Sequence, residues 1–224
     1  MAQFELTGVA KFFTRGPNVI RALDGIDLQI DAGEFIALEG PSGSGKTTLL
    51  QLLGALDRAG AGTLVFEGRD LAELPDRQLA TIRLRSFGFV FQQFNLIPTL
   101  TAVENVEAKL IPAGGTRQRA LELLAEVGLA ERAEHLPGQL SGGEQQRVGI
   151  ARALSVDPRV VLADEPTGNL DTAIGKEIID LLAGLAAEHG STVIVATHDA
   201  TLAGRAPRRV EIRDGRLTGD PIAA

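Results

Sequence analysis

One stretch of the chain constrains its fold more than any other, namely Gly40-Pro41-Ser42-Gly43-Ser44-Gly45-Lys46-Thr47-Thr48. It has the G-x-x-x-x-G-K-[ST] spacing of a phosphate-binding loop. The apolar run 35–38 before it predicts a buried strand, and leucines at helical spacing from Leu49 to Leu56 predict a helix after it. A Gly/Ser linker would explain the composition of the stretch but not its flanks. The sequence therefore predicts a strand, a glycine-rich turn and a helix, the context in which this motif binds phosphate.

The residue types of this phosphate loop suit phosphate groups and a magnesium ion. Glycines allow successive backbone N–H groups to point inward, and the helix N-terminus adds positive partial charge. Lys46 is expected to bridge the β- and γ-phosphates, and the Thr47 hydroxyl is expected to ligate Mg²⁺. The predicted nucleotide contacts are Gly40, Ser42, Gly43, Ser44, Gly45, Lys46, Thr47 and Thr48.

Composition limits the class of protein. A chain of 224 residues, 44% of them hydrophobic, fits one α/β domain with a small inserted lobe. No apolar run approaches the ~18–20 residues of a membrane span, and the N-terminus lacks a basic-then-apolar signal, so we expect a soluble, cytoplasmic protein. The absence of cysteine excludes disulfides, thiolate catalysis and Cys-ligated zinc. A net charge of −7 disfavours a broad nucleic-acid surface.

The pattern of apolar and turn residues predicts a nucleotide-binding α/β core, at 1–92 and 156–224, with a helical insertion at 93–155. Short apolar or alternating runs predict strands, and apolar residues spaced three or four apart predict helices. A turn at Asp214-Gly215 predicts a final hairpin. The expected strands are 3–9, 25–31, 35–38, 63–66, 87–91, 160–163 and 192–196, the expected hairpin is 210–217, and the expected helices are 76–84, 116–127, 143–155 and 174–188.

Two adjacent carboxylates follow the apolar strand 160–163. Asp164 and Glu165 are therefore expected at the carboxyl end of that strand, the edge at which open α/β sheets bind ligands. Asp164 suits the role of holding Mg²⁺ through water, because a hard cation prefers anionic oxygen. Glu165 suits the general base that activates the attacking water. Alone, such a pair is merely a solvated turn, but together with the phosphate loop it predicts hydrolysis of a nucleoside triphosphate.

Two further side chains follow predicted strands. His198 comes directly after the strand ending at Thr197, where its imidazole can donate to a γ-phosphate. Gln92 follows the strand 87–91 and opens the helical insertion, so its amide can contact Mg²⁺ or the attacking water. Alone, Gln92 would be an ordinary loop glutamine. His135 and His189 are interpreted as solvated surface residues.

The most specific stretch is Leu140-Ser141-Gly142-Gly143-Glu144-Gln145-Gln146-Arg147. Ser-Gly-Gly at the start of a helix is usually only a cap, although it also offers N–H groups and a dipole to an anion. The whole octet resembles the signature of the ATP-binding cassette (ABC) ATPases. The resemblance covers essentially the whole chain, because the phosphate loop, Gln92, the signature segment 140–147, Asp164-Glu165, Asn169-Leu170-Asp171 and His198 occur in that family's order.

The resemblance implies a fold and an assembly. The implied fold is α/β, with a P-loop NTPase (RecA-like) core, an antiparallel β subdomain and an inserted α-helical subdomain. Two copies would enclose two MgATP as a homodimer, and an aromatic residue upstream would stack on adenine. Phe13 matches that position best, with Phe12 adjacent, and either ring can stack. The signature residues Ser141, Gly142, Gly143 and Glu144 would serve the partner's nucleotide, and Asp171 would couple the two sites.

Finer resemblance points to a function at a membrane. Segments 91–98 and 166–171 look like those of the ATPases of lipoprotein-releasing and macrolide-exporter systems. This implies an ATPase subunit at the inner face of the cell membrane, bound to transmembrane permease subunits through Gln92 and 93–105. Permease crosslinks to 205–224 instead would contradict that surface.

Other functions fit this sequence less well. Related cell-division ATPases share most of the motifs, so an ATPase partner of a non-transporting division or signalling complex is the alternative. An ATPase of DNA repair would carry a coiled-coil or zinc-bearing insertion, for which the stretch between Gln92 and Ser141 is too short, and no nucleic-acid partner is expected. A translation-factor ATPase would carry two cassettes, and a phosphate-loop kinase has no use for the signature.

Overall fold

The computed structural model describes residues 2–16 and 18–219. These residues form two compact units. Unit 1 comprises the described residues of Met1–Arg83 and Ile194–Ala224, and unit 2 is Leu84–Val193. The core and the helical insertion at 93–155 are defined by sequence motifs, whereas these two units are defined by how compactly the chain folds. The predicted division therefore stays a prediction.

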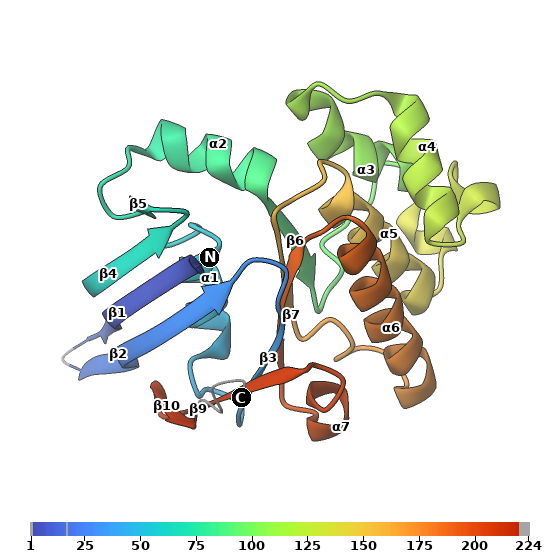
Figure 1. Ribbon diagram of the computed structural model, residues 1–224. Helices are drawn as coiled ribbons and strands as arrows, with labels where there is room; N and C mark the ends of the chain where they lie inside the picture. Colours follow the sequence, from blue (N-terminus) through green and yellow to red (C-terminus); the bar gives the residue numbers. More distant parts are fainter. Residues whose placement is uncertain (1, 17, 220–224) are drawn as a thin grey trace. The chain divides into compact units, whose positions relative to one another are not determined.

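Unit 1 contains an antiparallel sheet with the strand order β2-β1-β4-β5. Its long hairpin and the neighbouring strand are drawn in blue to cyan in Figure 1. Alternating residues of these strands, such as Phe4 and Leu6, are buried, and the Phe4 and Phe66 rings pack 4.9 Å apart. The strands are β1 (Ala2–Arg15), β2 (Asn18–Asp31), β4 (Ala61–Phe66) and β5 (Arg69–Asp70).

The second sheet of unit 1 has the order β10-β9-β3-β8. Strands β3 and β9 are parallel, whereas β9 and β10 form the predicted hairpin, in which Asp214 and Gly215 both have positive φ. The strands are β3 (Phe35–Glu39), β8 (Thr192–Thr197), β9 (Arg208–Arg213) and β10 (Arg216–Gly219), and the helices are α1 (Lys46–Leu53), α2 (Asp76–Ser86) and α7 (Ala200–Ala203); β8 and α2 each cross the boundary between the units.

One expectation for α1 is wrong. The helix ends at Leu53 and does not extend to Leu56, because Gly54 caps it and Ala55 follows with φ +52°. Leu56 therefore lies outside the helix and is 49% exposed.

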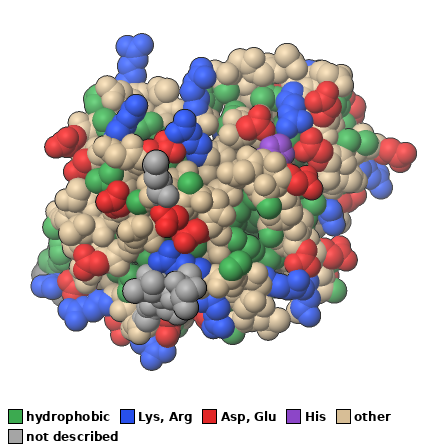
Figure 2. Space-filling view, viewed as in Figure 1, with side chains coloured by type: hydrophobic (Ala, Val, Ile, Leu, Met, Phe, Trp, Pro, Cys, Tyr) green, Lys and Arg blue, Asp and Glu red, His purple; other side chains and the backbone are tan. Residues whose placement is uncertain are grey.

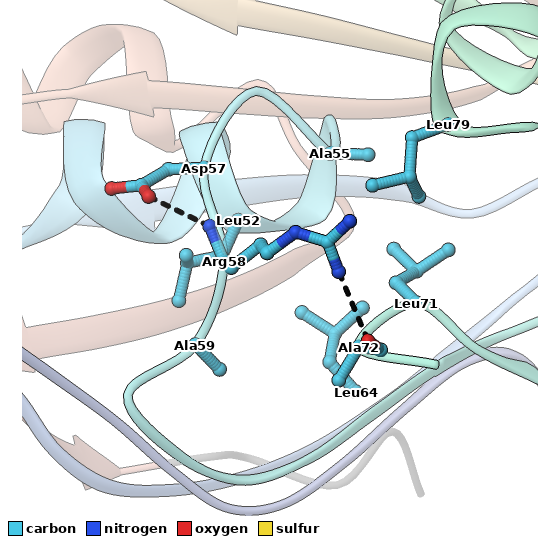
Figure 3. A pocket seen from close by; sticks show the side chains of 9 residues that line it. All are labelled: Leu52, Ala55, Asp57, Arg58, Ala59, Leu64, Leu71, Ala72 and Leu79. Atoms are coloured by element: carbon cyan, nitrogen blue, oxygen red, sulfur yellow. Dashed lines mark hydrogen bonds between the residues drawn. The ribbon is translucent and has the colours of Figure 1, made fainter. Parts of the chain in front are cut away.

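Arg58, in the segment after α1, contacts the segment before α2, and Figure 3 shows its bond to the Ala72 carbonyl. Its guanidinium donates to the carbonyls of Ala72 (2.9 Å) and Leu74 (2.8 Å) and to the Asp76 carboxylate (2.9 Å). One side chain thus ties the end of α1 to the start of α2. The neighbouring cavity measures about 20 Å³, room for about one water molecule, so it offers no ligand site.

Unit 2 is built around α5. This helix packs against α3, α4, α6 and β6, and its residues Val148, Ile150, Ala151 and Leu154 are all buried. The strands of the unit, β6 and β7, pair in parallel. Figure 1 shows the helices in green to orange. The elements are β6 (Phe87–Phe91), α3 (Ala102–Leu110), α4 (Arg117–Glu126), α5 (Gly142–Leu154), β7 (Val160–Asp164) and α6 (Thr172–Glu188), with short 3₁₀ turns at Ile111–Ala113, Ala130–Arg132 and Pro137–Gln139.

Polar side chains begin each helix of unit 2. Thr101, Thr116, Ser141 and Asp171 accept hydrogen bonds from backbone N–H groups of the first turn. These groups have no partner within a helix, so each cap stabilises its helix by about 1 kcal/mol. The predicted starts of the helices at 116, 143 and 174 are each confirmed within two residues.

The interpretation of His189 as a solvated residue is wrong. Its side chain is only 13% exposed, with Nδ1 2.8 Å from the Asp157 carboxylate and Nε2 3.6 Å from that of Glu126. The C-terminus of α6 thereby reaches two acids that come from α4 and from the segment before β7.

Two further features of the fold are the length of the apolar helices and the distribution of charged side chains on the surface. Within the part of the chain that the structure describes, no helix is long and apolar enough to cross a membrane. Acidic and basic side chains are interspersed over the face seen in Figure 2, so no patch of a single sign dominates that face.

Candidate nucleotide site

The phosphate loop lies in unit 1 between β3 and α1, as predicted. Gly40 has φ +156°, and a Cβ there would lie 2.1 Å from the Ile212 carbonyl of β9, so only glycine fits. Lys46 is buried, with 5% of the residue exposed, and its ammonium donates to the carbonyls of Gly40 (2.8 Å) and Pro41 (3.1 Å). The loop thus wraps around its own lysine.

One atom of this loop indicates a ligand. The Ser44 hydroxyl is buried, and it has no hydrogen-bond partner among the residues that the structure describes. A buried polar atom without a partner is costly, and a phosphate oxygen would satisfy it. Ser42, Gly43 and Thr47 are exposed along the same loop. These residues therefore fit a phosphate group at the start of α1.

Three other predicted residues, His198, Phe13 and Phe12, also lie in unit 1. His198 follows the end of β8 and is exposed, and Asp199 next to it caps α7. Phe13 and Phe12 are almost equally exposed, at 41% and 40%. The Lys11 ammonium lies 5.4 Å from the Phe13 ring centroid, and the Arg21 guanidinium lies 5.8 Å from that of Phe12. Because both rings are accessible and both already face a cation, exposure does not select between them as the adenine contact.

The carboxylate pair lies in unit 2, beside Gln92. Parallel pairing aligns Phe91 of β6 with Asp164 of β7, so Gln92 and Glu165 leave the same edge of the sheet. Glu165 has φ +45°, an uncommon conformation for a residue with a side chain. Such strain persists where the surroundings enforce it, most often at functional sites.

Hydrogen bonds hold this edge together. The Asn169 amide donates to the Gln92 carbonyl (2.9 Å), and the Gly168 N–H donates to the Glu165 carbonyl (3.0 Å). Asp171 caps α6 by accepting from the N–H groups of Ala173 and Ile174. The role of Asn169 was missed from the sequence, because nothing local to residue 169 indicates a partner 77 positions away.

The signature segment begins α5 in unit 2. The Ser141 and Glu144 side chains form a capping box, in which the Glu144 carboxylate accepts from both the N–H and the hydroxyl of Ser141 at 2.8 Å. The bond from the Ser141 N–H, and then that from its hydroxyl, hold the pKa of Glu144 below its usual value. A Cβ at Gly143 would lie 3.0 Å from Ile174 of α6, so this helix start is closely packed.

The fold and these two groups of residues define a phosphate-loop nucleotide-binding protein of the α/β class. The family model described as "ABC transporter" matches residues 23–168. A protein of Thermotoga maritima, named an uncharacterized ABC transporter ATP-binding protein, is 49% identical over 219 residues, which cover 96% of this chain and 93% of the relative. The chain belongs to the ABC transporter family.

Other relatives are longer. The macrolide export ATP-binding/permease proteins MacB 1/2 of Paracoccus denitrificans and MacB of Hyphomonas neptunium are 50% and 48% identical over 96% of this chain. The chain spans about a third of their length, 33% and 34%. Among solved structures, a dimeric post-hydrolysis state of the ATP-binding cassette MJ0796, bound to ADP and Pi, superposes with a TM-score of 0.90 at 44% identity, covering 97% of both chains. The predicted fold class is confirmed.

Proposed function

We propose that this chain is the ATP-binding and ATP-hydrolysing subunit of an ABC transporter. The observation that carries the proposal is the phosphate loop: it wraps Lys46, and it contains a buried Ser44 hydroxyl that lacks a partner among the described residues. Membership of the ABC transporter family supports the same conclusion.

The residues take the following roles in this proposal. Lys46 neutralises charge on the β- and γ-phosphates, and the neighbouring N–H groups of the loop bind their oxygens. Thr47 and Gln92 supply oxygen ligands of Mg²⁺, which offsets phosphate charge when bound, and Asp164 holds the ion through water. Glu165 accepts a proton from the attacking water, and His198 donates to the γ-phosphate. Phe13 stacks on adenine.

Two copies of the chain act together. Ser141, Gly142, Gly143 and Glu144 serve the nucleotide held by the other copy, and Asp171 couples the two sites. The dimeric cassette to which this chain is similar supports such an assembly. One chain then carries two half-sites, which explains a second anion-binding helix start without a second lysine loop.

The dimer works at a membrane. It lies in the cytoplasm against the inner face of the cell membrane, bound to permease subunits of an export or lipoprotein-release system. The similarity to ATP-binding/permease proteins named for macrolide export supports this step.

The Glu165→Gln variant tests the proposal. It removes the base and keeps the shape of the side chain, so ATP hydrolysis is expected to fall at least about 10²-fold. ATP should then hold a stable dimer, whereas ADP should not. Size-exclusion chromatography with light scattering measures the oligomer with each nucleotide, and phosphate release measures hydrolysis. A variant that elutes as a monomer with both nucleotides would contradict the two-copy arrangement, and a wild-type chain without ATP hydrolysis would contradict the proposal as a whole.

A further inference from the structure

Gln146 is a buried amide with partners in two other segments of unit 2. It lies on α5, five residues after Ser141, and its side chain is 0% exposed. Its Nε2 donates to the Pro166 carbonyl (2.5 Å) and to the Phe91 carbonyl (3.4 Å). Because both partners are carbonyl oxygens, the NH₂ end of the amide must face them.

These two carbonyls adjoin the residues that the proposed reaction uses. Phe91 directly precedes Gln92, and Pro166 directly follows Glu165. The Asn169 amide adds a third hydrogen bond between these segments by donating to the Gln92 carbonyl. Gln146 therefore joins the helix that starts at the signature to both segments.

A second side chain of α5 holds the segment after Gln92. The Arg152 guanidinium donates to the Phe94 carbonyl (2.9 Å) and to the Asn95 carbonyl (2.5 Å). Phe94 and Asn95 both have positive φ, at +59° and +48°, so the segment keeps an uncommon conformation. The helix thus holds the chain on either side of Gln92.

Packing alone is a poor explanation for an amide at this position. The Gln146 Oε1 atom is buried and has no hydrogen-bond partner among the described residues. A methionine of similar size would fill the space without burying an unpartnered oxygen. The amide is favourable only through its donor end, which indicates that the two hydrogen bonds are the reason for a glutamine here.

We propose that Gln146 is a positioning residue that couples the signature helix to the Gln92 and Glu165 segments. The proposal rests on the proposed function, because it assigns these segments to ATP hydrolysis. The two hydrogen bonds of Gln146 go to the backbone carbonyls of Phe91 and Pro166, which adjoin Gln92 and Glu165. Gln146 holds the backbone on which each is carried, so that the half-site for the partner's nucleotide and the residues for the chain's own nucleotide move together.

Steady-state ATP hydrolysis of Gln146→Met and Gln146→Glu tests this role. The Met variant keeps the volume and loses both donors, so kcat should fall about tenfold, with KM for ATP changed less than about twofold. In the Glu variant only the protonated carboxyl can donate, so its kcat relative to wild type should rise as the pH is lowered from 8 to 6. Gln118→Met, on the exposed face of α4, is the control and should match wild type.

Hydrogen exchange read by mass spectrometry supplies a measurement that does not need hydrolysis. In Gln146→Met, the backbone amides of 91–95 and 165–170 should exchange faster than in wild type. The amides of 102–110, which form α3, should exchange at the wild-type rate. Wild-type kcat in both Gln146 variants, or an equal loss of kcat in both at every pH, would overturn the positioning role. If the Met variant does not fold, the pH dependence of the Glu variant decides. If wild type does not hydrolyse ATP, the proposed function fails, and unchanged exchange at 91–95 and 165–170 would overturn this inference separately.

Discussion

Lys109 shows how one residue's environment changes its chemistry. Lys109 lies near the end of α3, and its ammonium donates to the carbonyls of Phe87 (2.7 Å) and Ala153 (3.1 Å). Burial, with a smaller contribution from the Arg152 guanidinium, lowers the pKa of Lys109 to about 7. The structure places no carboxylate among the residues that line the adjoining cavity of about 180 Å³, namely Phe89, Phe91, Asn95, Lys109, Arg152 and Ala153.

This pKa predicts a pH dependence of stability. An unfolded lysine titrates near 10.4, so between about pH 7 and 10 the unfolded chain binds more protons than the folded one. The cost of the buried charge is fully present below pH 7 and falls as the pH rises. The free energy of unfolding should therefore rise with pH by at most about 1.4 kcal/mol per unit from this group.

Urea unfolding at pH 7 and pH 9 measures the effect. The gain in stability should be smaller in Lys109→Met than in wild type. Lys176→Met removes an exposed lysine of α6 and should keep the wild-type gain. Parallel changes in all three proteins would show that Lys109 is not the group responsible.

At the scale of elements, Asn105 organises the segment that precedes α3. It is 1% exposed, and its Oδ1 accepts from the Ile97 N–H (2.7 Å). Its Nδ2 donates to the carbonyls of Ile97 (3.2 Å), Leu100 (3.0 Å) and Thr101 (2.9 Å). Within the segment the Leu100 N–H donates to the Ile97 carbonyl (3.1 Å), and this one helix side chain adds four further hydrogen bonds to the non-helical backbone at 97–101.

Truncating this side chain should release the segment. Asn105→Ala removes all four hydrogen bonds and leaves the Ile97 N–H and the Leu100 carbonyl without their Asn105 partner, so we expect a loss of about 2–4 kcal/mol in the free energy of unfolding. Limited proteolysis should find new cleavage at 95–101, and urea unfolding measures the energy. Gln118→Ala, on the exposed side of α4, should change neither. Asn105→Ala with wild-type stability and no new cleavage would show that the four hydrogen bonds contribute little.

At the scale of the whole molecule, the segment held by Asn105 and Arg152 is our expected contact with the permease. Ile97 within it is 45% exposed, although it is large and apolar, which suits a protein-binding surface. A photo-crosslinking residue at Ile97 should capture a transmembrane permease when tagged protein is purified from native membranes in a gentle detergent. The same residue at the exposed Thr218 of β10 should not.

Mass spectrometry of the crosslinked partner separates the possible outcomes. A permease with a large extracytoplasmic domain would support export or lipoprotein release. A division-site membrane protein would support the ATPase and contradict a transporter. Permease crosslinks from Thr218 alone would show that the contact lies elsewhere.

Local patterns in the sequence specify most of the elements, the order of the motifs and the chemistry of the phosphate loop, but they did not predict α3, β5 or α7. The predicted features depend on patterns within a few positions, such as the glycines around Lys46, the apolar run before Asp164 and the cap at Ser141. Most strands and helices were therefore predictable to within a few residues. The early end of α1 was not, because Leu56 fits the helical spacing while Gly54 ends the helix.

Tertiary structure alone decided which polar groups are enclosed and what they contact. Gln146 reaches Pro166, Lys109 reaches Ala153, and His189 reaches Asp157, each across 20 or more positions of the chain. No local pattern encodes such a pair, since each contact exists only once separate helices and strands pack together. Because of this packing, His189, which was expected in solvent, contacts two carboxylates. Gln146, for which no role was predicted, connects the Gln92 and Glu165 segments.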